Sequence, residues 1–251
     1  MITQALQAKL RQLKLSGMLQ TLELRAEQSA QRQLAPLEFF ALLLDDELER
    51  RNQARLVRRL AYSGCDAAKT LTQFDFSAAP GVNRTLIQDL ATCAFLPRHE
   101  NILICGPSGV GKSHLANAIA IEALKRDFRV LARPAHRLLA DLHAARASGA
   151  HSRLFARLLS CDLLVLDDFG LQALSAQAVQ DLYEIITERY ERGSLIITSN
   201  RAFAEWAEVF NNDLLASAAL DRLTHHAHTL IIRGDSYRQR NRRKEAPTLS
   251  S

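Results

Sequence analysis

The fold is decided by one stretch of the sequence, Asn101-Ile102-Leu103-Ile104-Cys105-Gly106-Pro107-Ser108-Gly109-Val110-Gly111-Lys112-Ser113. Its apolar beginning predicts a buried β-strand, and its end fits the pattern G-x-x-x-x-G-K-[ST]. The glycines let the backbone curl so that its N–H groups face phosphate oxygens. The helix expected from His114 to Lys125 adds the positive end of its dipole. The stretch therefore predicts a phosphate-binding loop between a strand and a helix.

This loop predicts a site for ATP and Mg²⁺. Lys112 would reach the β- and γ-phosphates, and the hydroxyl of Ser113 would ligate the metal ion. An ordinary glycine turn would account for the glycines but not for the Lys-Ser pair. The residues expected to bind the nucleotide are Gly106, Pro107, Ser108, Gly109, Val110, Gly111, Lys112, Ser113 and His114.

Two further apolar strands end in polar residues. Leu163 to Leu166 is followed by Asp167 and Asp168. This is a Walker B pattern, in which Asp167 would hold the metal and Asp168 would polarise the attacking water, where Glu is the commoner residue. The third strand ends at Asn200, the position of the sensor 1 amide in P-loop ATPases with an additional strand. An ordinary strand-end turn is the alternative at Asn200.

The order of predicted elements indicates an α/β protein with a small helical domain before it. Strand-like runs separated by amphipathic helices favour a parallel sheet flanked by helices. These runs are 101–105, 129–132, 162–167, 194–199 and 228–232. The expected division is a helical domain at 1–64, a connector at 65–99, the ATPase domain at 100–238 and a basic, disordered tail at 239–251.

The second long helix of the helical domain is predicted to begin at Pro36. The apolar residues expected to share one face are Phe40, Leu44, Leu48, Leu56 and Leu60. The opposite face is expected to carry Glu47, Glu49 and a run of arginines. The arginine stripe is either a solvated surface or a set of phosphate contacts. Its members are Arg50, Arg51, Arg55, Arg58 and Arg59.

Composition excludes several classes of protein. With 251 residues, 47% hydrophobic and 24% charged, the chain can build a real core and is not collagen-like or disordered. Its apolar runs are shorter than the ~20 residues of a membrane span, and its N-terminus has no signal-peptide core. We therefore expect a soluble, cytoplasmic protein with no membrane contact. The net charge of +5 favours an anionic partner without proving one.

Cysteine and histidine carry no predicted chemistry. Cys65, Cys93, Cys105 and Cys161 have no metal-binding spacing and are expected to be buried, reduced thiols. The cluster His225-His226-Ala227-His228 has no acidic or cysteine partner at ligand spacing. Adjacent histidines on a helix also point in different directions, so no metal is expected there.

Two arginines late in the chain are candidates for catalysis in an assembly. Arg222 follows Asp221 on a predicted helix, where it could reach the γ-phosphate held by a neighbouring subunit. Arg238 ends the segment Ser236-Tyr237-Arg238 after the last strand. Taken alone, each arginine is more simply an exposed surface residue. Only their occurrence together with the earlier motifs supports a catalytic role.

Together the motifs resemble the AAA+ ATPases of the DnaC/IstB clade, and most of all the IstB-type helper ATPases of bacterial insertion sequences. The resemblance covers nearly the whole chain. Its most specific parts are two segments that follow the strand ending in Thr198-Ser199-Asn200. The first is Asp221-Arg222-Leu223-Thr224-His225-His226, and the second is Gly234-Asp235-Ser236-Tyr237-Arg238. The other matching segments are Leu13–Met18, Phe40–Leu44, Gly106–Leu115, Arg189–Glu191 and the aromatic residues Phe203, Trp206 and Phe210.

The resemblance implies an AAA+ fold and an ATP-dependent activity on DNA. Proteins of this family bind ATP, assemble into rings or spirals on double-stranded DNA and stimulate a transposase. By similarity, Asn200 is sensor 1, Arg222 an arginine finger and Arg238 sensor 2. Asp168 departs from the Glu of the general pattern. Candidates for contacts with the DNA backbone are Lys14, Arg50, Arg51, Arg126, Arg133 and Arg137.

Three alternatives stay open at this point. A DnaC-like loader of a replicative helicase would share the ATPase half and differ in its helical partner-binding domain. A P-loop kinase of small molecules would need an acceptor pocket and a lid, and would not need Arg222 and Arg238 in this setting. A DNA-binding clamp that hardly hydrolyses ATP is the third.

Overall fold

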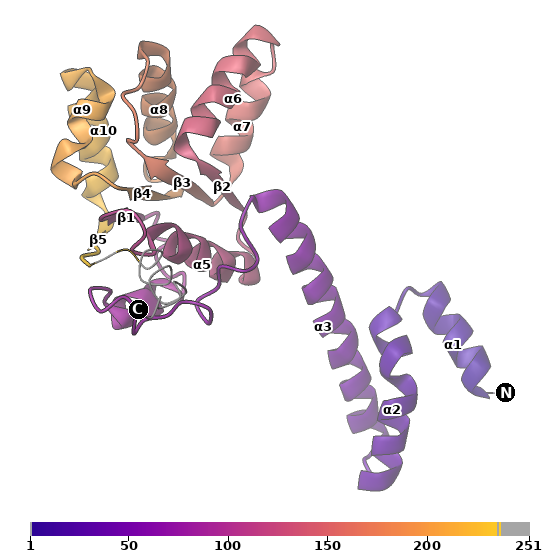
Figure 1. Cartoon of the computed structure of the whole chain (residues 1–251). Coiled ribbons are helices and arrows are strands. Elements are labelled where there is room, and N and C mark those ends of the chain that lie inside the picture. The colour runs from indigo at the N-terminus through magenta and orange to yellow at the C-terminus, as the bar shows by residue number, and fades with distance from the viewer. Residues whose placement is uncertain (1, 235, 237–251) are drawn as a thin grey trace, which may run out of the picture. The chain divides into compact units, whose positions relative to one another are not determined.

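The computed structural model describes residues 2–234 and 236. The chain divides into two compact units, Met1–Arg59 and Leu60–Ser251 (Figure 1). No helix among the described residues has both the length and the apolar character needed to cross a membrane.

The first unit is helical, as predicted. It contains α1 (Ile2–Gln12), α2 (Ser16–Arg32) and the greater part of α3 (Pro36–Ser63). Leu10, Met18, Leu22 and Leu43 form its small core.

The close approach of α2 and α3 is set by Gly17 and Glu47. A Cβ atom on Gly17 would lie 2.6 Å from the Cα of Glu47, so only glycine fits there. The buried carboxylate of Glu47 accepts hydrogen bonds from the backbone N–H groups of Gly17 (2.5 Å) and Met18 (3.4 Å). It therefore caps the first turn of α2, where Leu15 supplies no side-chain cap. Arg51 pairs with the same carboxylate at 2.6 Å.

The predicted assignment of faces on α3 is wrong in two respects. Glu47 is 4% exposed and faces α2, whereas Phe40, Leu44 and Leu48 are 52%, 42% and 57% exposed. Residues spaced by four advance about 40° around a helix at each step, so they do not stay on one face. The face packed against the core carries Leu43 and Phe39 instead.

We predict that the first unit loses stability in acid through Glu47. Burial alone would raise the pKa of Glu47, but Arg51 and the N–H groups of Gly17 and Met18 hold it below its usual value of 4.5. Because the pKa of Glu47 is lower in the folded state than in the unfolded state, its ionised carboxylate stabilises the fold above pH ~4.5. This stabilisation is lost as the pH falls through the pKa of the folded state. Circular dichroism should show the acid unfolding of α1–α3 shifted in Glu47→Gln relative to wild type. A Glu27→Gln control, altered at an exposed position of α2, should follow wild type; identical curves for all three proteins would contradict the assignment.

The second unit is built on a five-stranded sheet in the order β2-β3-β4-β1-β5. Every neighbouring pair is parallel, so the predicted parallel sheet is confirmed. The strands are β1 (Asn101–Cys105), β2 (Val130–Pro134), β3 (Leu163–Phe169), β4 (Ser194–Ser199) and β5 (Ala227–Ile231).

Helices cover both faces of the sheet (Figure 1). On one face lies α5 (Lys112–Lys125), which packs against β2, β3 and β4. The other face carries α6 (Ala135–Ala147), α7 (His151–Ser160), α8 (Ala176–Arg189), α9 (Trp206–Phe210) and α10 (Asp213–His225). The short helices α4 (Arg84–Leu90) and η1 (Phe203–Glu205) complete the unit.

Alternating side chains of each strand supply the two cores. In β1, for example, Leu103 and Cys105 belong to the core cluster shared with α6 to α10. Ile102 and Ile104, which alternate with them along the strand, are fully buried on the opposite face of the sheet. A sheet covered on both faces needs apolar residues at every position, and this explains why β1 is apolar over nearly its whole length.

Three of the four cysteines are buried, as expected, and Cys65 is half-buried. Burial raises the pKa of the Cys93 and Cys105 thiols to about 11. Both therefore stay protonated near neutral pH and act as small apolar residues.

Arg189 is a buried cation that ties three segments together. It is 1% exposed, and its guanidinium donates to the carbonyl oxygens of Leu158 and Cys161 (2.8 Å each), of Asp162 (3.2 Å) and of Ser194 (2.8 Å). A Cβ atom on Gly193 would lie 2.7 Å from Arg189 Nη2. The end of α7, the start of β3 and the start of β4 are thus fixed to one side chain.

We predict that Arg189→Met lowers the free energy of unfolding by at least about 3 kcal/mol, because several buried carbonyl groups lose their donor at once. Urea titration followed by circular dichroism measures this loss. Arg192→Met is the matched control, since Arg192 is 74% exposed in an ion pair with Glu188 and should change stability by less than about 0.5 kcal/mol. Equal effects of the two substitutions would contradict the role given to Arg189.

Candidate nucleotide site

The parallel strands bring the predicted motifs to one edge of the sheet. The phosphate-binding loop follows β1, the two aspartates end β3, and Asn200 follows β4. Because all strands run the same way, these carboxyl ends lie side by side, where ligands of α/β sheets bind. The strand register fixes how the three motifs are aligned along the strands: Ile104 pairs with Thr198, and Leu166 pairs with Ile197.

The phosphate-binding loop has the backbone that its glycines permit. Gly111 has φ of 96° as the residue before α5, and Gly106 has φ of 156°. A Cβ atom on Gly106 would lie 2.3 Å from the carbonyl oxygen of Ile232, in the segment after β5. The loop therefore leads directly into the N-terminus of α5, whose free N–H groups favour an anion.

Lys112 connects two of the predicted motifs. It is 4% exposed, and its ammonium group donates to the carbonyl oxygen of Pro107 at 2.7 Å and to Oδ1 of Asn200 at 2.6 Å. The distance between Lys112 and Asn200 is the direct evidence that the end of β4 reaches the phosphate-binding loop. Asn200 is thus more than a strand-end turn.

A β-bulge places both aspartates of β3 opposite one residue of β4. The register is shifted between Leu166 and Phe169, so that Asp167 and Asp168 face Thr198 together. Asp168 has φ of 55°, in the left-handed region that aspartate tolerates better than most residues.

Thr198 was not singled out in the sequence, although it lies between the predicted motifs. Its fully buried hydroxyl accepts a hydrogen bond from the backbone N–H of Asp168 at 2.9 Å and donates one to Oδ1 of Asp167. One side chain therefore orients both acidic residues. The sequence did offer one indication of this role, because Thr198 lies within the third motif, on the predicted strand that follows that of the aspartates.

The connector forms another wall of the site, which sequence reasoning did not foresee. The side chain of Asn117 on α5 holds the connector by accepting from the N–H of Asp66 (2.8 Å) and donating to the carbonyl groups of Asp66 and Lys69. Phe74 lies against Gly111, where a Cβ atom would be 2.7 Å from its ring. His114 contacts the same ring edge to face, with centroids 5.3 Å apart, and its Nε2 bonds the carbonyl of Thr70.

These elements enclose a cavity of about 700 Å³. This is within the usual size of ligand pockets, about 300–1,000 Å³. Of the predicted nucleotide-binding residues, Ser108 to His114 line the cavity, and Gly106 and Pro107 lie in the loop just before them. The remaining lining residues are Ala68, Lys69, Gln73, Phe74, Asp75, Ala78, Ala79, Pro80, Asp168, Leu171, Asn200, Ile232, Arg233 and Gly234.

The structure does not bring Arg222 to this cavity. Arg222 lies near the end of α10, where its guanidinium donates to the carbonyl of Ala218 at 2.8 Å and lies 5.8 Å from the ring of Tyr183. It shares a small hollow with Asn101 and Leu195, which are at the amino ends of β1 and β4. Arg238 lies outside the described residues, but Ser236 packs against Gly109 of the loop.

The sheet order, the loop after β1 and the acidic end of β3 define an AAA+ P-loop fold. Solved structures agree with this class. The DnaC helicase loader has a TM-score of 0.53 at 22% identity, covering 59% of this chain and 87% of that one. AMPPCP-bound DnaA from Aquifex aeolicus has a TM-score of 0.57 at 22% identity over 72% of this chain and 56% of its own.

The chain belongs to the family of IstB-like ATP-binding proteins, whose model matches residues 8–245. It is 38% identical over 239 residues to the "Insertion sequence IS21 putative ATP-binding protein" of Pseudomonas aeruginosa, covering 95% of this chain and 90% of that protein. It is 34% identical to the ATP-binding protein named for insertion sequence IS5376 in Geobacillus stearothermophilus, over 87% of each chain. ATP binding and an association with insertion sequences are therefore properties of the family.

We predict that Thr198→Val destabilises the second unit by about 1–3 kcal/mol, because the N–H of Asp168 and a carboxylate oxygen of Asp167 both lose a buried partner. Thr224→Val is the control, since Thr224 is exposed on α10 and bonds only backbone carbonyls within its own helix. Urea titration should separate the two variants. A Thr198→Val protein as stable as Thr224→Val would show that the hydroxyl does not hold the bulge.

Proposed function

We propose that this chain is a Mg²⁺-dependent ATPase that assembles with copies of itself on double-stranded DNA and stimulates the transposase of an insertion sequence. The observation that carries the proposal is the separation of Arg222 from the cavity in its own chain. The cavity holds a phosphate-binding loop and carboxylates, while the candidate arginine lies at the other edge of the sheet. A complete site would then need two copies of the chain.

The residues around the cavity fit this chemistry. The N–H groups of the loop and Lys112 would bind the phosphates of ATP. The hydroxyl of Ser113, which lines the cavity, is an oxygen donor of the kind that Mg²⁺ prefers. The carboxylate of Asp167 is another such donor; Asp167 is not among the lining residues, but it is the neighbour of Asp168, which is, and it bonds Thr198. Asp168 and Asn200, which line the cavity, would orient the attacking water. When bound, Mg²⁺ would neutralise the charge that develops on the phosphate oxygens.

The length of β1 explains why Arg222 would act on a neighbouring copy. The loop follows the carboxyl end of β1, and Asn101 at its amino end lies beside Arg222. The first and last of its five residues are separated by four steps of about 3.3 Å, roughly 13 Å in all, which an arginine side chain does not span. An arginine finger in trans would make hydrolysis depend on assembly. Loss of the γ-phosphate contact after hydrolysis would loosen the boundary between copies.

Contacts with the DNA backbone are proposed for basic side chains of both units. On α3, Arg51, Arg55 and Arg58 are exposed. Arg51 and Arg126 are the weaker candidates, because Glu47 pairs with Arg51 at 2.6 Å and Glu122 pairs with Arg126 at 2.9 Å. Contacts with phosphates carry no base specificity, and binding through them would weaken steeply as salt is raised.

A helicase loader is the second candidate, because the chain resembles the DnaC helicase loader in structure. At 22% identity this resemblance concerns the fold alone. Addition of a transposase or of a replicative helicase to the DNA-bound protein distinguishes the two. Stimulation of strand transfer supports the proposal; tight helicase binding without any effect on the transposase contradicts it. Phosphate transfer to a metabolite, without ATPase activity dependent on DNA, would instead identify a kinase.

We predict complementary defects in Lys112→Ala and Arg222→Ala. Lys112→Ala should lose ATP-dependent assembly on duplex DNA, because the charge facing the β- and γ-phosphates is gone. Arg222→Ala should bind ATP normally and hydrolyse it about 10³-fold more slowly or worse, the range seen for arginine fingers in GTPases. Sedimentation with and without DNA, together with phosphate release, measures both defects.

A mixture of the two variants is the decisive measurement. Lys112→Ala can supply Arg222 to the intact loop of Arg222→Ala, so the mixture should recover part of the activity. Arg153→Ala, which alters an exposed arginine on α7, is the control and should behave as wild type. No recovery at any mixing ratio would contradict a finger that acts in trans, and assembly by Lys112→Ala would contradict the nucleotide site.

A further inference from the structure

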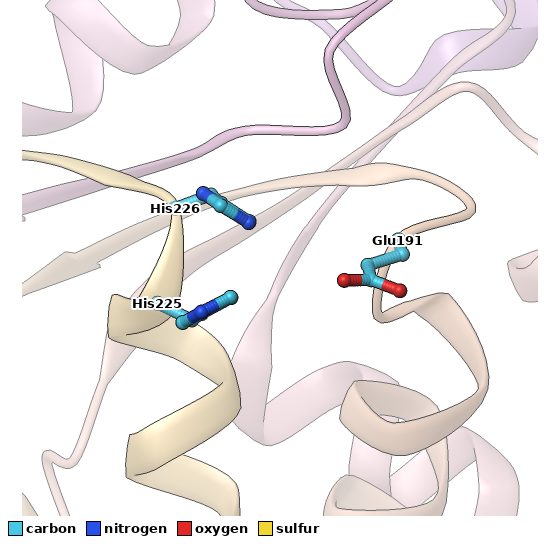
Figure 2. Close-up of side chains that lie close together, drawn as sticks. All are labelled: Glu191, His225 and His226. Carbon is cyan, nitrogen blue, oxygen red and sulfur yellow. The ribbon is translucent and has the colours of Figure 1, made fainter.

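Two histidines and a glutamate from distant parts of the chain meet at the amino edge of the sheet. Glu191 follows α8, His225 is the last residue of α10 and His226 comes directly after it. One nitrogen of each imidazole and a carboxylate oxygen of Glu191 all lie within 4.8 Å of one another. Figure 2 shows the carboxylate pointing toward the two rings.

The end of α10 explains how neighbouring histidines converge. Inside a helix, adjacent histidines would diverge, as was expected from the sequence. His226 lies outside the helix, with φ of −131° and ψ of 76°, and the two ring centroids are 4.0 Å apart. The acidic partner, Glu191, could not be found by ligand spacing because the fold and not the local sequence brings it there. An acidic residue therefore lies near the histidines in space, although none lies at ligand spacing in the sequence.

The backbone that carries these side chains is well held. Glu191 has φ of 57° in a tight turn closed by bonds from the N–H groups of Arg192 and Gly193 to the carbonyl of Arg189 (3.0 and 2.9 Å). On the other side, Asn101 donates its side-chain amide to the carbonyl of Leu223 and its backbone N–H to that of His226. The exposed side chains can thus adjust while their attachment points stay fixed.

Tyr190 adds a second layer to the cluster. Its hydroxyl lies 2.9 Å from Nδ1 of His225. A histidine that binds a metal usually bonds a polar group through its other ring nitrogen, which fixes the tautomer and the direction of the ring. Tyr190 can do this for His225 and leave Nε2 for an ion. His228 is different, because its Nε2 is paired with Glu100 at 2.8 Å.

We propose that Glu191, His225 and His226 bind a divalent transition-metal ion, and that Zn²⁺ is the ion they favour. Two imidazoles and one carboxylate are a zinc ligand set, with ligand bonds of about 2.0–2.2 Å and a fourth position for water. Donor atoms around such an ion lie about 3.4 Å apart, so atoms within 4.8 Å of one another must approach by at most about 1.5 Å, which exposed side chains achieve by torsional changes. The ion would tie the α8–β4 turn to the end of α10.

The site is separate from the nucleotide cavity. Its residues lie at the amino ends of β4 and β5, while the cavity is at the carboxyl ends. Binding of Zn²⁺ should therefore need neither ATP nor DNA. It should persist in Lys112→Ala, so its test is independent of the proposed function.

The proposal is tested by titrating untagged protein with Zn²⁺ against a chromophoric chelator. Wild type should bind one ion per chain, and the double variant Glu191→Gln, His226→Ala should lose that ion. Tyr190→Phe should bind about 10- to 100-fold more weakly, as expected for loss of a group that orients a ligand. His143→Ala, which removes an exposed histidine of α6, is the matched control and should bind as wild type.

Two further measurements make the result independent of any change in folding. Zn²⁺ should raise the melting temperature of wild type and of His143→Ala but not that of the double variant, whose circular dichroism should match wild type. Co²⁺ should give the visible absorption of a four-coordinate ion in wild type and in His143→Ala but not in the double variant. Absence of saturable Zn²⁺ binding by wild type, or equal binding by the double variant, would overturn the proposal.

Discussion

The candidate site depends on five strands that all run in the same direction. Parallel pairing places the ends of β1, β3, β4 and β5 at one edge, so residues more than 90 positions apart reach a single cavity. Within that edge, the bulge at Asp167 and Asp168 lets Thr198 serve both residues through one hydroxyl. The hydrogen bond from Lys112 to Asn200 then joins the loop to β4. Each contact is local, but each exists only because the register of the sheet is fixed.

Much of this edge could be predicted because its motifs are short and continuous. The strand and loop from Asn101 to Ser113 carry their own conformational signals, as do the apolar runs that become the other strands. Asn117 and Phe74 could not be found in the same way. Their roles come from the path of the connector over α5, which no periodic pattern encodes. Arg238 was predicted from a motif that ends outside the described residues.

The errors in the sequence analysis have a common physical origin. Spacing by four residues suggested that Phe40, Leu44 and Leu48 share one face and that Glu47 lies on the opposite, solvated face. The close approach of Gly17 to Glu47 instead decides which face of α3 is packed. A charged residue at the centre of a helix contact cannot be expected from hydrophobic periodicity. Likewise, the histidines were judged as part of a helix that in fact ends at His225. In both places a tertiary contact or a helix end overrode a local rule.

The cap that Glu47 gives to α2 has a consequence for how the first unit responds to stress. A helix that contains its own cap can form its first turn unaided, whereas the first turn of α2 loses its acceptor whenever α3 moves away. Fraying at that end and separation of the two helices are thus the same event. The unit has few ways to open in part, and hydrogen exchange at Gly17 and Met18 reports the cooperativity of the pair as a whole.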